Sequence, residues 1–478
     1  MTKYRIALER YRWRTIFIFL ILNTLLGFRI HGQSGNNPQV WFTPNVGSVD
    51  MLDLFSDPTQ WDSARAKVDV FKFNADHVNS WLCNWCDTNT LSSLVNVQAF
   101  SKLKQWNIDI AIEIAPPLPQ GVYPTQCSLE HQLAVQRAYN WTVDAITNVE
   151  SNGGVVDYLI IDEPIRRWYS KFFSTGGPAC QIDNVTDIAA FVSTYVGALQ
   201  TTYPSIEIGQ FILYPEVDVD EIKSYVLTME NLGTPLSFIH LDVHGARIHE
   251  YGTAGGIKSL SQVRSDLRDL ESFFNSRNIA FAPVLIDLGW NTQYWLYGDY
   301  DNQTYYDGTI FWINQVKQAI SNPDHYLFQS WVSPYYLNTS LLSKTFPINL
   351  PDNDTTIYSH TRLILDGCNI LNSPIMGFFN KQQNLPEGFA LQQNYPNPFT
   401  HETTITFSVV NPSEVQIKIY NTLGLHVLTL VDEQKSTGEY QVSWNGRNEQ
   451  GLILPGGVYV YSISVDGQVL RKRLVILR

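Results

Sequence analysis

Residues 156–164 read VDYLIIDEP, an apolar run that ends in two adjacent carboxylates and a proline. The part from 156 to 163 is long enough for one strand buried on both faces, as the strands of parallel sheets are. Similar runs occur at 40–46, 68–74, 108–115, 206–214, 236–244, 279–288 and 326–331. Between most of these runs, apolar residues recur at three- and four-residue spacing, which predicts helices over 91–106, 129–149, 188–202, 219–232, 260–276 and 309–320.

This repeated alternation of strand and helix predicts an α/β fold, a (β/α)8 TIM barrel over residues 37–375. An open, doubly wound sheet is the alternative fold. No G-x-G-x-x-G follows the first predicted strand and no G-x-x-x-x-G-K-[ST] occurs, so the usual phosphate-binding loops of open sheets are missing. We therefore expect a barrel, and we expect no cofactor.

The N-terminus has the pattern of a secretory signal peptide, predicted over residues 1–34. Five Lys and Arg residues precede an apolar run at 15–28, which is shorter than the roughly 20 residues that a membrane-spanning helix needs. An uncleaved anchor is the alternative, because Ile30-His31-Gly32 matches the usual cleavage pattern poorly. We expect contact with the membrane only through the signal peptide, during export.

The composition is that of a folded, acidic protein, with 44% hydrophobic residues, 16% charged residues and a formal net charge of −13. These values exclude a disordered, collagen-like or multi-span membrane chain. Binding to nucleic-acid phosphates draws on clustered Lys and Arg, which this chain lacks outside its two ends. We expect no nucleic-acid partner.

The chain has five cysteines, Cys83, Cys86, Cys127, Cys180 and Cys368. In an exported protein they can form disulfides, and the odd number leaves at least one thiol free or paired between chains. The first two have the C-x-x-C spacing of redox motifs. No thioredoxin-like βαβ start accompanies them, so a local loop disulfide is favoured and all five cysteines are predicted to be structural.

The C-terminal part differs from the barrel region. From residue 405 onward, short alternating segments are separated by Asn, Pro and Gly turn signals, which predicts a small antiparallel, immunoglobulin-like β-sandwich. Five motifs occur in order along it: LQQNYPNPF at 391–399, YNTLG at 420–424, WNG at 444–446, GGVYVY at 456–461 and RKRL at 471–474. Together these motifs resemble the type A sorting domain of the bacterial type IX secretion system.

This resemblance implies a linker at 376–385 and a sorting domain at 386–478. Such a domain would direct the folded barrel across the outer membrane, after the signal peptide has taken it across the inner one. The type IX machinery would then be a partner, and the protein would be secreted or held at the cell surface. A carbohydrate-binding or spacer module of immunoglobulin-like fold is the alternative.

Polar residues lie at or near the predicted carboxyl ends of seven of the eight strands, the end at which active sites of TIM barrels lie. They are Lys72, Asn74, Glu113, Asp162, Glu163, Tyr214, Asp242, His244, Asp287, Gln329 and Trp331. A polar side chain on a strand buried on both faces needs a partner or a function, and convergence of several predicts a site. Neither H-E-x-x-H nor G-x-S-x-G occurs, so acid/base chemistry by carboxylates is predicted, which suits glycoside hydrolysis.

Three of these strand ends resemble the large clan of (β/α)8 glycoside hydrolases. The segments are Asp162-Glu163-Pro164, Asp287-Leu288-Gly289-Trp290 and Trp331, where the clan has Asn-Glu-Pro, Glu-x-Gly-Trp and an aromatic platform. The resemblance implies a carbohydrate substrate. Glu163 would be the general acid/base, Asp287 would occupy the nucleophile position, and Trp331 would stack under the sugar.

Two departures affect the assignment of the second carboxylate. Asp162 replaces the asparagine that normally contacts the substrate, and Asp287 is one methylene shorter than the usual glutamate. The shorter reach leaves Asp242 and Glu113 as alternative partners of Glu163. We expect Trp290 and the remaining polar strand-end residues to contact substrate.

Two other classes of function stay open. His240, Asp242 and His244 alternate along one strand, so they are expected on one face, where with Glu216 or Asp287 they could bind a divalent metal for a hydrolase or deacetylase. A barrel that binds glycans without cleaving them is the other class, because Asp287 is short. The carboxylate mechanism, which needs no metal, is the leading prediction.

Overall fold

The computed structural model describes residues 38–45, 48, 50–79, 89–118, 126–172, 180–248, 257–287, 302–321, 323–330, 348–354, 356–372, 389–391, 394, 397, 399, 401–421, 426–465 and 468–476. The chain divides into two compact units, Met1–Ser373 and Pro374–Arg478. The predicted signal peptide and linker lie outside the described residues.

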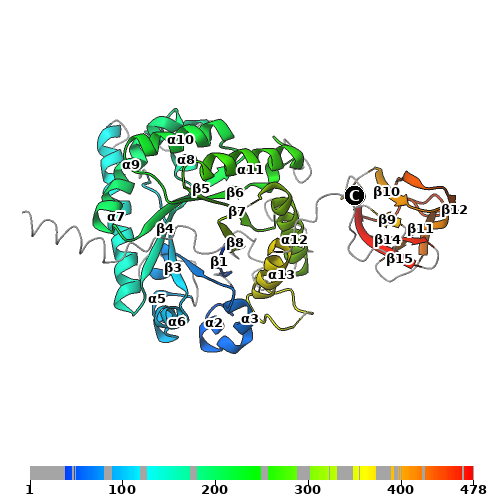
Figure 1. Ribbon diagram of the computed structural model, residues 1–478, viewed down its shortest axis with the longest axis horizontal. Helices are drawn as coiled ribbons and strands as arrows, with labels where there is room; N and C mark the ends of the chain where they lie inside the picture. Colours follow the sequence, from blue (N-terminus) through cyan, green and yellow to red (C-terminus); the bar gives the residue numbers. More distant parts are fainter. Residues whose placement is uncertain are drawn as a thin grey trace, which may run out of the picture. The chain divides into compact units, whose positions relative to one another are not determined.

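The first unit is a closed barrel of eight parallel strands in sequential order, surrounded by helices (Figure 1). The strands are β1 (Gln39–Thr43), β2 (Val70–Asn74), β3 (Asp109–Ile114), β4 (Val156–Ile161), β5 (Glu207–Tyr214), β6 (Phe238–Val243), β7 (Ala280–Leu285) and β8 (His325–Gln329). Each of the eight apolar runs forms one of these strands. The predicted fold class is therefore confirmed, and the open-sheet alternative is excluded because β8 pairs with β1.

The outer helices follow the predicted segments closely. They are α5 (Leu91–Asn96), α6 (Ala99–Gln105), α7 (Cys127–Ser151), α9 (Val185–Thr202), α10 (Val219–Asn231), α11 (Leu260–Asn275) and α12 (Asn302–Ala319). The segment predicted as one helix at 91–106 is two helices, separated where Gln98 adopts a left-handed conformation with φ 58°. Capping boxes begin α10 at Asp218 and α11 at Ser259.

Several further helices were not predicted from the sequence. The short ones are α2 (Asp53–Ser56), η1 (Pro58–Trp61), α3 (Asp62–Arg65), α4 (Ala75–Val78), α8 (Pro164–Trp168), η2 (Ser170–Phe172) and η3 (Gly245–Arg247). The long one is α13 (His360–Asn372). Gly367 lies inside α13 although glycine disfavours helix interiors. A Cβ there would lie 2.5 Å from the Phe328 ring, so the glycine lets α13 pack closely against β8.

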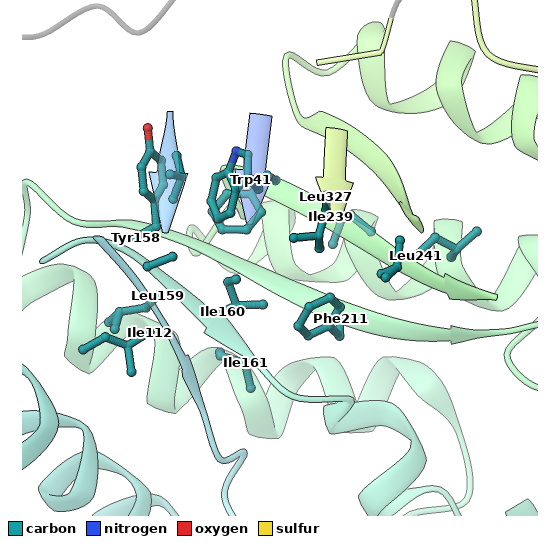
Figure 2. Close-up of a cluster of buried hydrophobic side chains, with 14 of the residues drawn as sticks. Trp41, Ile112, Tyr158, Leu159, Ile160, Ile161, Phe211, Ile239, Leu241 and Leu327 are labelled. Atoms are coloured by element: carbon teal, nitrogen blue, oxygen red, sulfur yellow. The ribbon is translucent and has the colours of Figure 1, made fainter. Parts of the chain in front are cut away.

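The barrel interior is filled by aromatic side chains. Trp41 of β1 contacts Tyr158 of β4 with ring centroids 4.7 Å apart, although β1 and β4 are not neighbours in the barrel. Trp41 also contacts His240 and His325, at 5.0 and 4.9 Å. Figure 2 shows labelled residues of this core, including Trp41 and Tyr158. Trp41 comes from the middle of β1 and the other rings from the first halves of their strands, which leaves the carboxyl ends for polar side chains.

Three aspartates stabilise the opposite end of the barrel. Asp69 accepts a hydrogen bond from the backbone N–H of Val40 at 2.8 Å. Asp157 and Asp324 accept in the same way from the neighbouring strands β3 and β7, each at 3.1 Å. Each aspartate lies at the start of its own strand and bonds to the strand beside it. These carboxylates have a structural role, and they are useful controls for the carboxylates at the other end.

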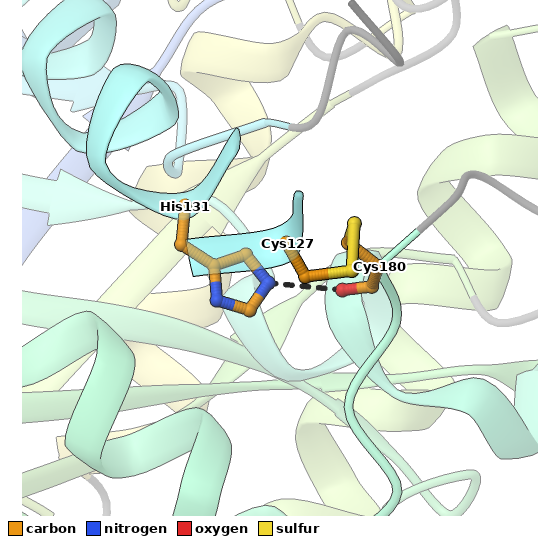
Figure 3. Close-up of a disulfide and its surroundings, with 3 residues drawn as sticks. All are labelled: Cys127, His131 and Cys180. Carbon is orange, nitrogen blue, oxygen red and sulfur yellow. Dashed lines mark hydrogen bonds between the residues drawn. A yellow bond between two sulfur atoms is a disulfide. The ribbon is translucent and has the colours of Figure 1, made fainter. Parts of the chain in front are cut away.

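A disulfide joins Cys127, at the start of α7, to Cys180 (Figure 3). The ring Nε2 of His131 lies 3.0 Å from the Cys180 carbonyl oxygen. The bond connects the segments that precede α7 and α9, which follow β3 and β4 respectively. Cys368 is a buried free thiol, and Cys83 and Cys86 lie outside the described residues.

The second unit consists of two antiparallel sheets, with strand orders β13-β10-β9 and β12-β11-β14-β15. The strands are β9 (Phe389–Leu391), β10 (Thr403–Val409), β11 (Ser413–Asn421), β12 (His426–Lys435), β13 (Gly438–Trp444), β14 (Gly457–Val465) and β15 (Gln468–Ile476). Along β10 every second residue is buried, as a strand with one core face requires. The predicted all-β architecture is confirmed.

Two asparagines of the LQQNYPNPF motif bond to this unit. The Asn394 backbone N–H donates to the Tyr461 hydroxyl at 2.8 Å, and its amide donates to Thr403 at 2.9 Å. Asn397 accepts from the Val475 backbone at 2.7 Å.

In the described part of the chain, no helix has the length and hydropathy needed to cross a membrane.

Candidate active site

A cluster of charged side chains lies at the carboxyl ends of strands β2 to β6. Its five carboxylates and four cations are Glu113, Asp162, Glu163, Glu216, Asp242, Lys72, Arg166, Arg167 and Arg247. The carboxylates act on one another electrostatically, since repulsion from Glu163 and Asp162 contributes to the pKa of both Glu113 and Asp242. In a TIM barrel this end of the strands carries the active site.

Glu163 has a strained backbone, with φ 41° and ψ 53° in the left-handed region. This conformation costs a non-glycine residue about 1–3 kcal/mol and is frequent at functional sites. Successive residues of a strand point to opposite faces, yet the carboxylates of Asp162 and Glu163 act on the same neighbours. The left-handed turn between β4 and α8 breaks the alternation, which accounts for both carboxylates lying in the cluster.

Lys72 and Glu113 form an ion pair inside the barrel, and the Lys72 side chain is fully buried. Burial lowers the pKa of Lys72, and the charge of Glu113 partly offsets this effect. Burial also raises the pKa of Glu113, although Lys72 opposes the rise. The Lys72 Nζ also lies over the Phe211 ring, 5.0 Å from its centroid. The pair therefore joins β2 to β3 within the charged cluster.

Arginines of α8 hold the two carboxylates at the end of β4. Arg166 Nη1 donates to Glu163 at 2.9 Å, and Arg167 Nη2 donates to Asp162 at 3.1 Å. Pro164 at the first position of α8 starts the short helix that carries both arginines. About half of the Arg166 side chain is exposed (50%), whereas Glu163 is buried (8%). The Glu163 carboxyl is therefore covered from solvent and paired with Arg166.

Glu216 follows β5 and accepts from two donors on the segment after β6. Its Oε1 is bonded to His244 Nδ1 and accepts from Arg247 Nε at 3.1 Å. Burial acts to raise the pKa of Glu216, but the bonds from His244 and Arg247 outweigh burial and the pKa is lowered. Glu216 is thus held ionised. The bond through Nδ1 to this carboxylate orients the His244 ring.

Besides Glu113, the carboxyls of Glu163 and Asp242 also have raised pKa values. Burial, followed by repulsion from Asp162, raises the pKa of Glu163, while Arg166 and Arg167 oppose the rise. Burial raises the pKa of Asp242 well above its ordinary value, and repulsion from Glu163, Glu216 and Asp162 adds to it. A pair of neighbouring carboxyls of this kind retains a proton at a pH where isolated carboxyls are ionised.

The structure brings together six of the twelve residues predicted for the site, namely Lys72, Glu113, Asp162, Glu163, Asp242 and His244. Asn74 pairs in register with Glu113, and its buried Oδ1 has no hydrogen-bond partner among the described residues. Gln329, on β8, accepts from the Thr43 hydroxyl at 3.4 Å. Trp290 and Trp331, predicted to contact the sugar, lie outside the described residues.

Tyr214 is a correction to the predicted site. Its hydroxyl donates to Asp266 of α11 at 2.6 Å, and Lys258 lies over its ring at 5.4 Å from the centroid. Tyr214 therefore faces the outer helix layer, because its place in β5 alternates with that of Phe211, which lies beside Lys72 inside the barrel. Sequence position near a strand end does not show which face a side chain takes.

Asp287, predicted as the partner of Glu163, is buried and lies just beyond the end of β7. A Cβ added at Gly308 of α12 would overlap the Asp287 carboxyl, which therefore lies against that helix. Asp242, one of the alternatives, lies in the cluster.

The histidines of the predicted metal site have separate partners. The His240 Nε2 lies 3.0 Å from His325 Nδ1 inside the aromatic core, where burial holds the pKa of His240 well below its ordinary value. His244 is bonded to Glu216 outside this core. Within the described ranges, no three His, Cys, Asp or Glu side chains are arranged to bind a metal ion.

Sequence reasoning missed the arginines of the site. Arg166 and Arg167 could have been found, because Pro164 predicts a helix start, and residues three and four positions after Glu163 then lie near it. Arg247 had no such signal. Its partner Glu216 is 31 positions away in the sequence, and only the adjacency of β5 and β6 brings the two together.

The comparisons with known proteins give one family match and several structural likenesses. Residues 396–468 match the model of the FlgD Ig-like domain family. A search of curated proteins found no match.

Solved structures similar to this chain include two endo-β-1,4-mannanases. The one from Thermotoga petrophila is 9% identical, with 93% of this chain and 98% of that chain covered and a TM-score of 0.47. A modular one from Cellulomonas fimi is 8% identical, with 92% and 93% covered and a TM-score of 0.41. PorZ, a type IX secretion component of Porphyromonas gingivalis, is 22% identical over 19% of this chain and 12% of its own, with a TM-score of 0.14. At these values none of the likenesses bears on activity.

Proposed function

We propose that the barrel is a glycoside hydrolase that cleaves a poly- or oligosaccharide with the carboxyl pair Glu163 and Asp242. The observation that carries this proposal is the pair itself. Two buried carboxyls lie at the carboxyl ends of different strands, both have raised pKa values, and repulsion from Glu163 contributes to the rise at Asp242. Glycoside hydrolysis needs one protonated and one ionised carboxyl beside the scissile bond.

The surrounding charges support this use of the pair. Arg166 donates a hydrogen bond to Glu163, and its positive charge also opposes the rise in the pKa of Asp242. The arginine therefore acts on both carboxyls. Lys72 and Glu113 form a buried ion pair of their own. The substrate must approach from the solvent side, where Arg166 and Arg167 are about half exposed.

The proposal is tested with the purified chain, freed of its signal peptide, on a panel of polysaccharides with chelator present. Release of reducing ends is measured for the wild type, Glu163→Gln, Asp242→Asn and the control Asp69→Asn. We expect both site variants to lose about 10²- to 10⁴-fold in rate, the usual contribution of acid/base catalysis, and the control to keep its activity. Binding without release would favour the glycan-binding alternative, and activity lost in chelator would favour a metal-dependent hydrolase.

The C-terminal unit serves export in this proposal. The motifs at 391–474 support a type IX sorting role, and the positions of Asn394 and Asn397 give the first motif a structural part in the fold. The enzyme would be secreted or held at the cell surface. Residues 386–478 fused behind a signal peptide and a fluorescent protein should send that protein out of a bacterium with the type IX system. Retention of the fusion in the periplasm would refute this assignment.

A further inference from the structure

The four cations of the charged cluster are matched one to one with four of its five carboxylates. Lys72 is paired with Glu113, Arg166 with Glu163, Arg167 with Asp162 and Arg247 with Glu216. The fifth carboxyl is Asp242. Among the described residues it has no ion-pair partner, and its buried Oδ1 accepts no hydrogen bond.

Asp242 is also surrounded by negative charge. The side chain is 7% exposed. Glu163 and Asp162 face it from the end of β4, and Glu216 faces it from the segment after β5. Arg166, whose charge opposes the rise in the pKa of Asp242, has its hydrogen bond to Glu163. An ionised Asp242 would therefore be buried without a counterion of its own, which is costly, whereas a protonated carboxyl is neutral and can donate a hydrogen bond.

We infer that Asp242 is the proton donor of the site and that Glu163, held ionised by Arg166, is its nucleophile or base. The inference rests on the proposed glycoside hydrolase function. It reverses the role of general acid/base that the resemblance of Asp162-Glu163-Pro164 to the glycoside hydrolase clan implies for Glu163. The causes of the pKa shifts agree with this assignment, since burial and three neighbouring carboxylates raise the pKa of Asp242, whereas Arg166 and Arg167 oppose the rise at Glu163.

The chemistry of this assignment is balanced as follows. The bond from the anomeric carbon to the glycosidic oxygen breaks, its electron pair stays on that oxygen, and the oxygen takes the proton of Asp242. The anomeric carbon receives an electron pair from the Glu163 carboxylate, or from a water whose proton passes to Glu163. In the first case a water then attacks the anomeric carbon, the bond to Glu163 breaks with its electron pair on the carboxylate, and the proton of that water passes to Asp242. In the second case the attacking water itself supplies the new hydroxyl. The products are an alcohol and a sugar with a free reducing end.

Substrates with different leaving groups separate the two roles. A dinitrophenyl glycoside needs no proton on its leaving group, whereas a polysaccharide does. We expect Asp242→Asn to lose at least about 10²-fold on the polysaccharide and less than about 10-fold on the dinitrophenyl glycoside. Glu163→Gln should lose heavily on both. The opposite pattern, with Glu163→Gln active on the dinitrophenyl glycoside and Asp242→Asn inactive on it, would overturn the inference.

A second measurement does not depend on hydrolysis. The purified chain, labelled with ¹³C at aspartate carboxyls, is titrated by NMR beside Asp242→Asn and Asp69→Asn. We expect one aspartate carboxyl to stay protonated near neutral pH, and its signal to be absent only from Asp242→Asn. If that signal is found but no glycoside is cleaved, the proposed function fails and the position of the proton stands. If Asp242 is ionised near neutral pH, the inference fails whatever the activity.

Discussion

The buried pair Lys72 and Glu113 allows a sharp test of the charged cluster. Lys72→Met keeps much of the side-chain volume but leaves Glu113 without its cation in the barrel interior. Breaking a buried ion pair by removing one partner costs about 3–5 kcal/mol, because the remaining charge is uncompensated. We expect this loss in the free energy of unfolding at pH 7, measured by urea titration of tryptophan fluorescence.

The pH dependence identifies the cause of the loss. Without Lys72, the folded-state pKa of Glu113 lies above its unfolded value of about 4.3, since burial already raises it in the wild type. The stability that a raised pKa contributes is fully present below the unfolded value and is lost as pH rises through the folded value. The deficit of Lys72→Met should therefore shrink from pH 7 to pH 5.

Two further variants complete this test. Lys72→Met combined with Glu113→Leu removes both charges and should recover most of the loss, since apolar replacements of buried pairs are often neutral. Lys223→Met, which breaks the surface pair with Asp269, should cost less than about 1 kcal/mol. A loss below about 1 kcal/mol for Lys72→Met at pH 7, or a deficit that grows at pH 5, would refute the reasoning.

Three other predictions concern the fold. Gly367→Ala should destabilise the barrel by about 1–3 kcal/mol in urea titration, because the new methyl would meet the Phe328 ring, and an unchanged midpoint would contradict this packing. Replacing both Cys127 and Cys180 by Ser should lower barrel stability by about 2–4 kcal/mol relative to the oxidised chain, and reductant should have no further effect on that variant. Asn394→Ala should cost the second unit about 1–3 kcal/mol through lost buried hydrogen bonds, seen as an earlier unfolding step in calorimetry while the barrel step stays in place.

The barrel could be predicted because its signal is local and repeated. Each strand of a parallel barrel is buried on both faces, so it appears in the sequence as a continuous apolar run. The helices between the runs bury one face, so they show helical periodicity. Helix α13 escaped prediction because Gly367, which its packing against Phe328 requires, interrupts a helical pattern.

The sequence alone determined the (β/α)8 architecture, the β-rich C-terminal unit and the polar character of the strand ends, since each depends on composition and spacing within a few residues. Only the tertiary structure decided which strand-end residues meet. Asp287 and Asp242 look equivalent in sequence, yet Asp287 lies against α12 and Asp242 lies beside Glu163. The pairing of Glu216 with Arg247 likewise depends on contacts between separate strands. Both outcomes follow from strand register and from the backbone conformation at the end of each strand, which no local pattern specifies.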